Sequence, residues 1–150
     1  MKLKKIKFFV NEAFFMSNFY PSSILIGEHI APTVEHAYQI CVYEKSSKSK
    51  LTKLDLEDLC KMNPSAIKEF GKSYYVPEEE ALYNMRSLLH KKFKDIGLRN
   101  KLLSTGDAEL IEGNIWGDFF WGVDLTSGRG KNYLGKLLMS ERHQINKGIL

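Results

Sequence analysis

The segment P-E-E-E-A-L-Y-N-M-R-S-L-L-H-K-K-F-K, residues 77–94, decides the fold class. Its apolar residues recur at helical spacing and form one stripe: Ala81, Leu82, Met85, Leu88, Leu89 and Phe93. Glutamates fill the first turn and lysines the last, which complements the helix dipole. The pattern therefore predicts a helix from Pro77 to about Lys94 that buries one face in a protein core.

Capping residues predict further helices on both sides of this segment. Thr33 is a good N-cap for a helix that begins at Val34, and Asn63-Pro64 supplies an N-cap and an N1 proline for a helix that stops at Gly71. The polar tract 44–50 between them is predicted to be a surface loop. Shorter or later helices are predicted over 54–62, over 98–104, and from Gly130 to a closing Gly148.

Strand signals are few and short. A strand is predicted over 4–10, followed by a turn at Asn11-Glu12, and a short strand or hairpin is predicted around Gly27. An extended run is predicted over 105–112. The sequence contains no internal repeat and no linker, and its predicted helices outnumber its strands. The expected fold is mainly α (α+β), a single multihelical domain over residues 1–150 with a few short β-strands.

Composition favours a reduced, intracellular protein. The sequence has a net charge of +4, a pI near 9.0 and no long apolar run or signal-peptide pattern, so we expect a cytoplasmic protein without membrane contact. Cys41 and Cys60 form no C-x-x-C pair and fit buried, reduced thiols. The mild basicity suits an anionic ligand such as a phosphate or loose contact with nucleic acid, but a lysine-rich solvated surface explains it equally well.

Two familiar types of site are not predicted. The run G-K-N-Y-L-G-K-L, residues 130–137, nearly spells a phosphate-binding P-loop, but Leu137 stands where the magnesium ligand Ser or Thr belongs and no buried strand precedes it. The four histidines have no ligand spacing with one another or with the cysteines, so we expect no metal site. No cofactor is predicted either.

Three stretches depart from ordinary core patterning: S-N-F-Y-P-S (17–22), T-V-E-H-A-Y-Q (33–39) and W-G-D-F-F-W-G (116–122). Each also has an ordinary structural explanation. Glu35 suits the first turn of a helix, Asp118 suits an Asx-turn, and the two tryptophans suit an aromatic corner. A partly buried carboxyl at Glu35 would alternatively be suited to proton transfer.

Taken in order, these stretches resemble the NADAR (YbiA-like) family. The resemblance runs from Phe14 to Arg142 and rests on N-F-Y-P-S, E-H-A-Y-Q, L-L-S-T-G-D-A-E-L-I-E, W-G and G-K-N-Y-L-G-K-L-L-M-S-E-R. It implies a metal-independent N-glycosidase that hydrolyses the C1′–N bond of a phosphorylated riboside, either a ribosylamino-pyrimidine intermediate of riboflavin biosynthesis or an ADP-ribose conjugate. The alternatives are an ADP-ribose or NAD-derived nucleotide-binding module without cleavage and an ADP-ribosyl-guanine hydrolase of the antitoxin or phage counter-defence type.

The resemblance also implies which residues act. Glu35 and Asp118 are the expected catalytic pair, with the roles of acid and water-activating base left open. Trp121 and Phe19 would stack on the base, while Asn18, Asn132, Arg142 and backbone amides over 130–135 would hold the ribose and phosphate at a helix N-terminus. The full set of expected substrate-binding residues is Asn18, Phe19, Tyr20, His36, Trp121, Gly122, Asn132, Gly135 and Arg142. The expected partner is the small-molecule substrate, with ADP-ribosylated nucleic acid as a further candidate.

The chain departs from the family pattern at three places. Ile30-Ala31 stands where many relatives carry a tryptophan before T-V-E-H, Val42 stands at a lysine position, and Lys72 follows Gly71 where a G-R pair is usual. If either basic position binds substrate or captures the sugar covalently in relatives, these departures bear on the substrate and on the activity.

Overall fold

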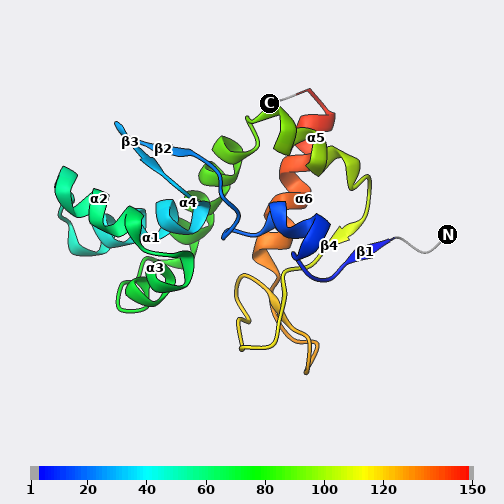
Figure 1. The fold of residues 1–150 in the computed structure, drawn as a ribbon. Helices are drawn as coiled ribbons and strands as arrows, with labels where there is room; N and C mark the ends of the chain where they lie inside the picture. The colour runs from blue at the N-terminus through cyan, green and yellow to red at the C-terminus, as the bar shows by residue number, and fades with distance from the viewer. Residues whose placement is uncertain (1–3, 149–150) are drawn as a thin grey trace. The chain divides into compact units, whose positions relative to one another are not determined.

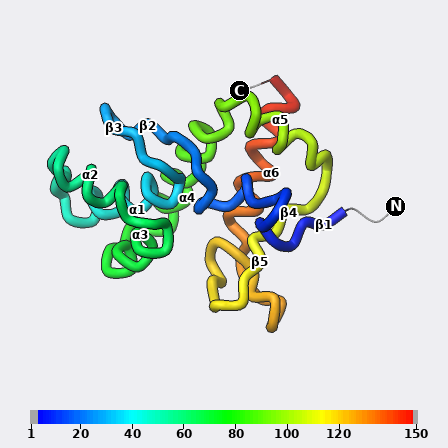
Figure 2. The backbone as a smooth tube through the Cα atoms, viewed as in Figure 1, coloured from blue at the N-terminus to red at the C-terminus, as the bar shows by residue number. Residues whose placement is uncertain are grey.

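The computed structural model describes residues 4–148, and they gather into two compact parts. The central part is the continuous segment from Asn18 to Lys92. The terminal part combines the two ends of the chain, up to Ser17 and from Phe93 onward. Figure 1 labels the helices and strands, and Figure 2 traces the same backbone as a tube. Helices dominate and the strands are short, so the predicted mainly α (α+β) fold class is confirmed.

The central part is a β-hairpin with four helices. The helix α1 packs against α3 and α4, and both strands of the hairpin lie against α1. Its core includes the buried side chains of Ile40, Leu59 and Ile67, one from each of the first three helices. The elements are β2 (Ile24–Ile26), β3 (His29–Ala31), α1 (Val34–Ser47), α2 (Lys53–Lys61), α3 (Pro64–Gly71) and α4 (Glu78–Lys92).

The helix α4 confirms the prediction made for residues 77–94, although it ends at Lys92 rather than at Lys94. Its apolar stripe is buried, with Met85 and Leu89 almost completely inaccessible to solvent. Burying large aliphatic side chains of this kind contributes about 1.5–3 kcal/mol each. The amphipathic pattern therefore placed the helix correctly because its apolar face became part of the core.

The helix α1 extends further than predicted. Thr33 caps it as expected, since its side-chain oxygen accepts a hydrogen bond from the His36 amide at 3.1 Å. The helix then continues to Ser47, so the loop predicted over 44–50 is wrong for residues 44–47. Polar side chains stabilise this last turn through tertiary contacts. The Glu44 carboxylate accepts from the Leu51 amide at 2.8 Å, and Lys45 pairs with Glu80 at 3.4 Å.

The terminal part joins chain segments that are distant in sequence. Strand β1 pairs in parallel with β4, and β5 pairs in parallel with β6. The helix α6 packs against β4 and α5, and η1 lies against α5. The elements are β1 (Lys5–Ile6), the 3₁₀ helix η1 (Asn11–Met16), α5 (Ile96–Ser104), β4 (Glu109–Leu110), β5 (Gly113–Asn114), β6 (Val123–Asp124) and α6 (Tyr133–Asn146).

Two predictions for the terminal part need correction. The strand predicted over 4–10 is confined to Lys5–Ile6, and the turn expected at Asn11-Glu12 is the start of η1, which buries Phe15 and Met16. The last helix begins at Tyr133 rather than at Gly130. Gly148 does follow its C-cap with a positive φ of 70°, as predicted. None of the helices between residues 4 and 148 is both long and apolar enough to cross a membrane.

Candidate active site

Glu35 lies in the first turn of α1 and is buried, with 7% of its surface exposed. Its backbone amide donates to the Asn18 carbonyl at 3.0 Å, which joins the 17–22 segment to the start of the helix. The Gln39 side chain donates to the Glu35 carboxylate at 2.9 Å. The helix dipole favours the ionised form at this position. The structure therefore holds a single oriented carboxylate in a largely desolvated place.

Asn18 has the strongest indication of a missing partner. Its side-chain nitrogen makes only a long contact with the Met85 sulfur at 3.6 Å, and its Oδ1 atom is buried without a hydrogen-bond partner among residues 4–148. A buried acceptor of this kind costs about 1–3 kcal/mol when it is left unsatisfied, and such atoms in native proteins call for a specific explanation. A ligand hydroxyl or a bound water would satisfy it. Its predicted role in substrate binding stays a prediction with this atom in its favour.

Two aromatic side chains follow Asn18, and each has a cation over its ring. The Lys68 ammonium lies 5.9 Å from the Phe19 ring centroid, and the Lys92 ammonium lies 5.8 Å from that of Tyr20. Both contacts lie within cation–π range. The S-N-F-Y-P-S stretch thus presents aromatic faces together with positive charge, which is a suitable lining for an anionic, planar ligand.

Lys92 is a candidate that sequence reasoning missed. It ends α4, where the sequence pattern gives it only the role of complementing the helix dipole, yet just 2% of its surface is exposed. Its spacing in the sequence could have indicated this burial. Lys92 lies four residues after Leu88 and three after Leu89, which places it on the apolar face of the helix. A buried ammonium beside Tyr20 adds a positive charge to the same part of the chain that holds Glu35.

His36 is held by the protein itself, and its predicted contact with substrate stays a prediction. The side chain is 1% exposed, and both ring nitrogens are engaged by the protein. The Nε2–H group donates to the Met62 carbonyl at 2.7 Å, and Nδ1 accepts from the Thr33 hydroxyl at 2.7 Å. A carbonyl can only accept, so Nε2 carries a proton, and both ring nitrogens are engaged by the protein. His36 instead connects the start of α1 to the end of α2.

Asp118 makes the Asx-turn that was the ordinary explanation for it. Its Oδ1 atom accepts from the backbone amides of Phe120 at 3.1 Å and Trp121 at 3.0 Å. Asn114 braces the turn, since its side chain accepts from the Asp118 amide at 2.9 Å and donates to the Asp118 carbonyl at 2.8 Å. The second carboxylate oxygen makes no hydrogen bond within residues 4–148. Asp118 thus has a structural role, and its catalytic role stays a prediction.

The amides at the start of α6 are hydrogen-bonded within the protein. The amides of residues 131–134 donate in turn to the carbonyls of Phe119, Gly122, Phe120 and Trp121, at 2.7–3.2 Å. These bonds fasten the loop over residues 113–132 to the first turn of the helix. The protein's own carbonyl groups therefore engage these four amides, and the predicted binding of a phosphate over 130–135 stays a prediction.

Asn132, Gly122 and Gly135 support this same junction. The Asn132 side chain donates to the Leu110 carbonyl at 2.9 Å and accepts from the Glu112 amide at 3.0 Å. A Cβ at Gly122 would overlap the Glu112 carbonyl, and one at Gly135 would overlap the Leu110 carbonyl. The structure explains these three residues by packing, and their predicted contact with substrate stays a prediction.

Arg142 has protein partners in the terminal part. Its guanidinium donates to the Thr105 hydroxyl at 2.8 Å and to the Ala108 carbonyl at 2.9 Å. Burial lowers the pKa of the guanidinium, and the nearby charge of Asp107 partly offsets this. Arg142 thereby fastens α6 to the turn that follows α5. Its predicted contact with a phosphate stays a prediction.

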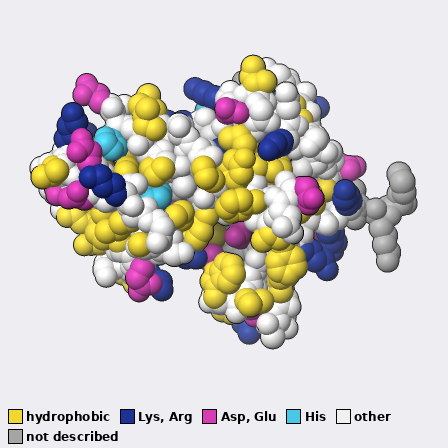
Figure 3. Space-filling model, in the orientation of Figure 1, with side chains coloured by type: hydrophobic (Ala, Val, Ile, Leu, Met, Phe, Trp, Pro, Cys, Tyr) yellow, Lys and Arg dark blue, Asp and Glu magenta, His cyan; other side chains and the backbone are white. Residues whose placement is uncertain are grey.

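The aromatic side chains of the 113–132 loop divide into two groups. Trp121 is half-buried and packs edge-on against Phe120, with ring centroids 4.7 Å apart, and Phe120 packs in turn on Tyr133 at 5.0 Å. Trp116 is 65% exposed, so it does not fill a core at the aromatic corner that was the ordinary explanation for it. Figure 3 shows hydrophobic side chains gathered on this loop, and the exposed ones are Ile115, Trp116 and Phe119.

The structure also shows where the departures from the family pattern lie. Val42 is buried with 3% exposure, and it follows Glu35 by seven residues, which puts both on one face of α1. Ile30 is 59% exposed on the β2–β3 hairpin, and Lys72 pairs with Glu69 at 2.7 Å on the surface. The face of α1 that carries Glu35 therefore has an apolar side chain at the position where the resemblance implied a lysine. Among residues 4–148 no three His, Cys, Asp or Glu side chains are grouped as metal ligands.

Comparison with known proteins identifies relatives over most of the chain. A family model described as the NADAR domain matches residues 7–146. An N-glycosidase of Nostoc punctiforme is 32% identical over 135 residues, covering 86% of this chain and 83% of that protein. N-glycosidase YbiA of Escherichia coli is 31% identical over 132 residues, covering 86% and 79%. A riboflavin biosynthesis protein of Vibrio vulnificus is 31% identical over 141 residues, but this chain spans only 36% of its length.

The fold agrees with these sequence matches. The NMR structure of the Escherichia coli protein YbiA superposes with a TM-score of 0.78 at 28% identity, covering 99% of this chain and 89% of that one. The similarity therefore extends over both compact parts of the chain.

Proposed function

The chain belongs to the NADAR domain family, and from this membership we propose that it is an N-glycosidase that hydrolyses the C1′–N bond of a phosphorylated riboside. The observation that carries the proposal is the buried carboxylate of Glu35, oriented by Gln39 and adjoining Asn18, in a chain similar to proteins named N-glycosidase. The substrate class we favour is a ribosylamino-pyrimidine phosphate of riboflavin biosynthesis or an ADP-ribose conjugate.

The reaction makes three demands on the protein. The leaving base must be protonated or otherwise stabilised, the oxocarbenium-like centre at C1′ needs nearby negative charge, and a water must be placed for attack. In our proposal Glu35 supplies the principal carboxylate and Asp118 the second. Asn18 accepts a hydrogen bond from the sugar, and Phe19, Tyr20 and Trp121 contact the base. The burial of Glu35 supports this, because electrostatic and proton-transfer interactions act more strongly where water is excluded.

Positive charge in the central part suits a phosphorylated substrate. The Lys68 ammonium lies over the Phe19 ring, and the Lys92 ammonium lies over the Tyr20 ring. Both rings directly follow Asn18, whose carbonyl accepts from the Glu35 amide. We propose that these two lysines bind the phosphate of the substrate. The proposal needs no metal ion and no cofactor.

The deciding experiment is a base-release assay. The protein is incubated separately with a ribosylamino-pyrimidine phosphate, ADP-ribosylated guanosine and NAD, and free base is measured by mass spectrometry. Release from one of these substrates by the wild type, reduced by about a hundredfold or more in Glu35→Gln, is expected for an acid or base in the reaction. Glu79→Gln is the matched control, because Glu79 is an exposed glutamate in the first turn of α4. It should retain full activity.

The other outcomes are equally informative. Unchanged turnover in Glu35→Gln removes Glu35 from the chemistry but leaves the reaction class standing. If ADP-ribose binds tightly but neither the wild type nor Glu35→Gln releases base, the protein is a nucleotide-binding module and not a glycosidase. The substrate from which base is released distinguishes a riboflavin-intermediate enzyme from a hydrolase of ADP-ribosyl guanine.

A further inference from the structure

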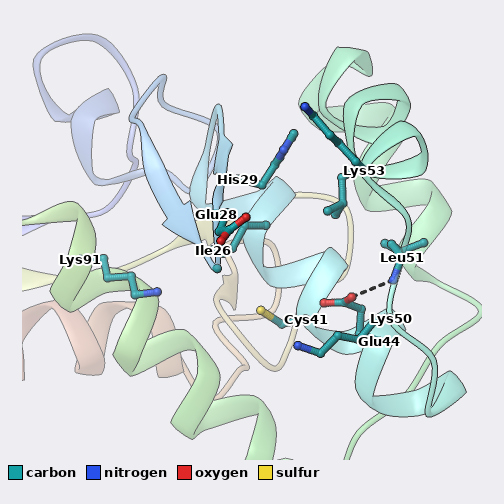
Figure 4. A pocket seen from close by; sticks show the side chains of 11 residues that line it. Ile26, Glu28, His29, Cys41, Glu44, Lys50, Leu51, Lys53 and Lys91 are labelled. Carbon is teal, nitrogen blue, oxygen red and sulfur yellow. Dashed lines mark hydrogen bonds between the residues drawn. The ribbon is translucent and has the colours of Figure 1, made fainter.

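A concave site lies in the central part, on another face of α1 from Glu35. It is a pocket of about 620 Å³ between the β2–β3 hairpin, α1, α4 and the start of α2 (Figure 4). Cys41 and Glu44 line it from α1. At 3.6 residues per turn these two positions point away from the face shared by Glu35 and Gln39. The pocket is therefore separate from the candidate active site.

The wall of this pocket carries more positive than negative charge. Lys50, Lys53 and Lys91 line it, against the carboxylates of Glu28 and Glu44. The Glu44 carboxylate is already used, since it accepts from the Leu51 amide at 2.8 Å. Lys91 is held in place by its hydrogen bond to the Leu25 carbonyl at 2.7 Å. In Figure 4 the side chains of Lys50 and Lys91 extend toward the middle of the pocket from opposite sides.

Two of these lysines lack a partner within the described chain. Neither the Lys50 ammonium nor the Lys53 ammonium forms a hydrogen bond or an ion pair with any of residues 4–148. By contrast, Lys45 in the last turn of α1 pairs with Glu80, and Lys72 pairs with Glu69. The pocket thus brings together cations that the protein itself does not neutralise, and an anion entering it would meet two of them.

The floor of the pocket is apolar. Ile26, Leu51 and Leu56 line it and also pack against the buried cluster of Ile40, Leu59 and Ile67. The Cys41 thiol adds a small polarisable group, and burial raises its pKa, so it is a neutral thiol at pH 7 rather than a nucleophile. An apolar floor with a few polar groups at the rim, and a volume of several hundred Å³, is typical of small-molecule sites.

We propose that this pocket binds a small organic anion whose apolar body lies on Ile26, Leu51 and Leu56 and whose charged head lies between Lys50, Lys53 and Lys91. Lysine ammonium groups act as point charges and accept either a phosphate or a carboxylate head. The concave shape favours a compact ligand over an extended polymer. The proposal does not depend on the glycosidase reaction.

The test uses three probes that share one apolar body and contain no glycosidic bond: naphthyl phosphate, naphthoate and neutral naphthalene methanol. Each is titrated into the ¹⁵N-labelled protein, and amide shifts are followed by NMR. At least one of the two anions should shift the amides of residues 26–29, 50–56 and 91, and the neutral probe should bind at least about tenfold more weakly. The anion that binds more tightly identifies the preferred head group.

Lysine variants test which positive charges contribute to binding of the anion. Lys50→Gln with Lys53→Gln should weaken the anion about tenfold, whereas Lys61→Gln with Lys94→Gln, the same change in net charge at exposed lysines outside the pocket, should not. Glu35→Gln should bind the anion unchanged. Four results would each overturn the proposal. The neutral probe could bind as tightly as the anions, or the shifts could lie outside the pocket. The lysine variant could bind the anion as the wild type does, or Glu35→Gln could lose binding.

Discussion

At the scale of single residues, the placement of Glu35 depends on a side chain and a glycine that carry no chemistry themselves. The Gln39 amide donates to the Glu35 carboxylate, and it lies against Gly71 at the end of α3. A Cβ at Gly71 would overlap the Gln39 amide carbon and oxygen. Gly71 is therefore needed for the close approach that keeps Gln39 in place, and Gln39 is a positioning residue for Glu35.

We predict that Gly71→Ala lowers kcat about tenfold while KM and the free energy of unfolding change little. The clash involves the far end of a flexible side chain, which can rotate away at small cost, but the rotation removes a hydrogen bond to a charged group. Steady-state kinetics on the substrate found in the base-release assay provide the measurement.

A double-mutant cycle provides the control for this prediction. In Gln39→Ala the Glu35 hydrogen bond is already gone, so adding Gly71→Ala should cost no further activity. If the two substitutions lower kcat independently, Gly71 does not act through Gln39.

A second residue-scale prediction separates the two roles of Asp118. Asp118→Asn retains the side-chain oxygen that accepts from Phe120 and Trp121, whereas Asp118→Ala removes it. Asp118→Ala should therefore lower the free energy of unfolding by about 1 kcal/mol, and Asp118→Asn should leave it nearly unchanged. If Asp118→Asn loses base release while its stability is intact, the carboxylate is catalytic. If Asp118→Asn keeps full activity, the only role of Asp118 is to form the turn.

At the scale of helices and strands, the cap at the start of α1 should be more important than its sequence signal suggests. Thr33 and Thr52 both cap helices through their hydroxyl oxygens, each at 3.1 Å. Thr52 is exposed, but Thr33 is 4% exposed and also donates to His36 Nδ1. Removing the Thr33 hydroxyl therefore leaves a buried ring nitrogen without a partner, in addition to losing the cap.

We predict that Thr33→Ala costs at least about 2 kcal/mol of stability and that Thr52→Ala costs about 1 kcal/mol. Urea denaturation of the two variants measures the difference. Equal costs would show that the Thr33–His36 side-chain bond contributes nothing beyond the cap.

The same elements show how far the sequence alone predicts the structure. The N-caps at Thr33 and Asn63 were predictable because a cap involves residues only two or three positions apart. The end of α1 was not, because residues 44–47 depend on partners far along the chain, Leu51 and Glu80. The candidate site divides likewise. A turn-forming Asp118 was recognisable from its neighbours, but the tertiary partner of His36, Met62, was not.

At the scale of the whole molecule, each compact part depends on a different kind of connection. The central part is a continuous segment, whereas the terminal part needs the pairing of β1 with β4, more than a hundred residues apart. Amphipathic spacing predicted the helices of both parts. It gave no sign of the parallel pair, because a two-residue strand carries too little pattern to specify its partner.

Stability at high pH provides a prediction for the chain as a whole. Burial, followed by the charge of Glu35, raises the pKa of Tyr38 in α1 from 10.0 to about 12. The unfolded chain therefore loses this proton first as pH rises. The stabilisation from the neutral hydroxyl is complete below pH 10 and is lost as pH rises through about 12, amounting to roughly 2–3 kcal/mol in all.

Tyr38→Phe should consequently flatten the decline in the free energy of unfolding between pH 10 and pH 12, measured by urea denaturation at closely spaced pH values. Tyr83→Phe is the matched control, since Tyr83 is 71% exposed in α4 and its removal should leave the decline as in the wild type. A decline of equal slope in both variants would show that Tyr38 titrates normally. Because Glu35 contributes to the shift, Glu35→Gln should make the decline smaller and end it at a lower pH, which would place an ionised carboxylate beside Tyr38 without any substrate present.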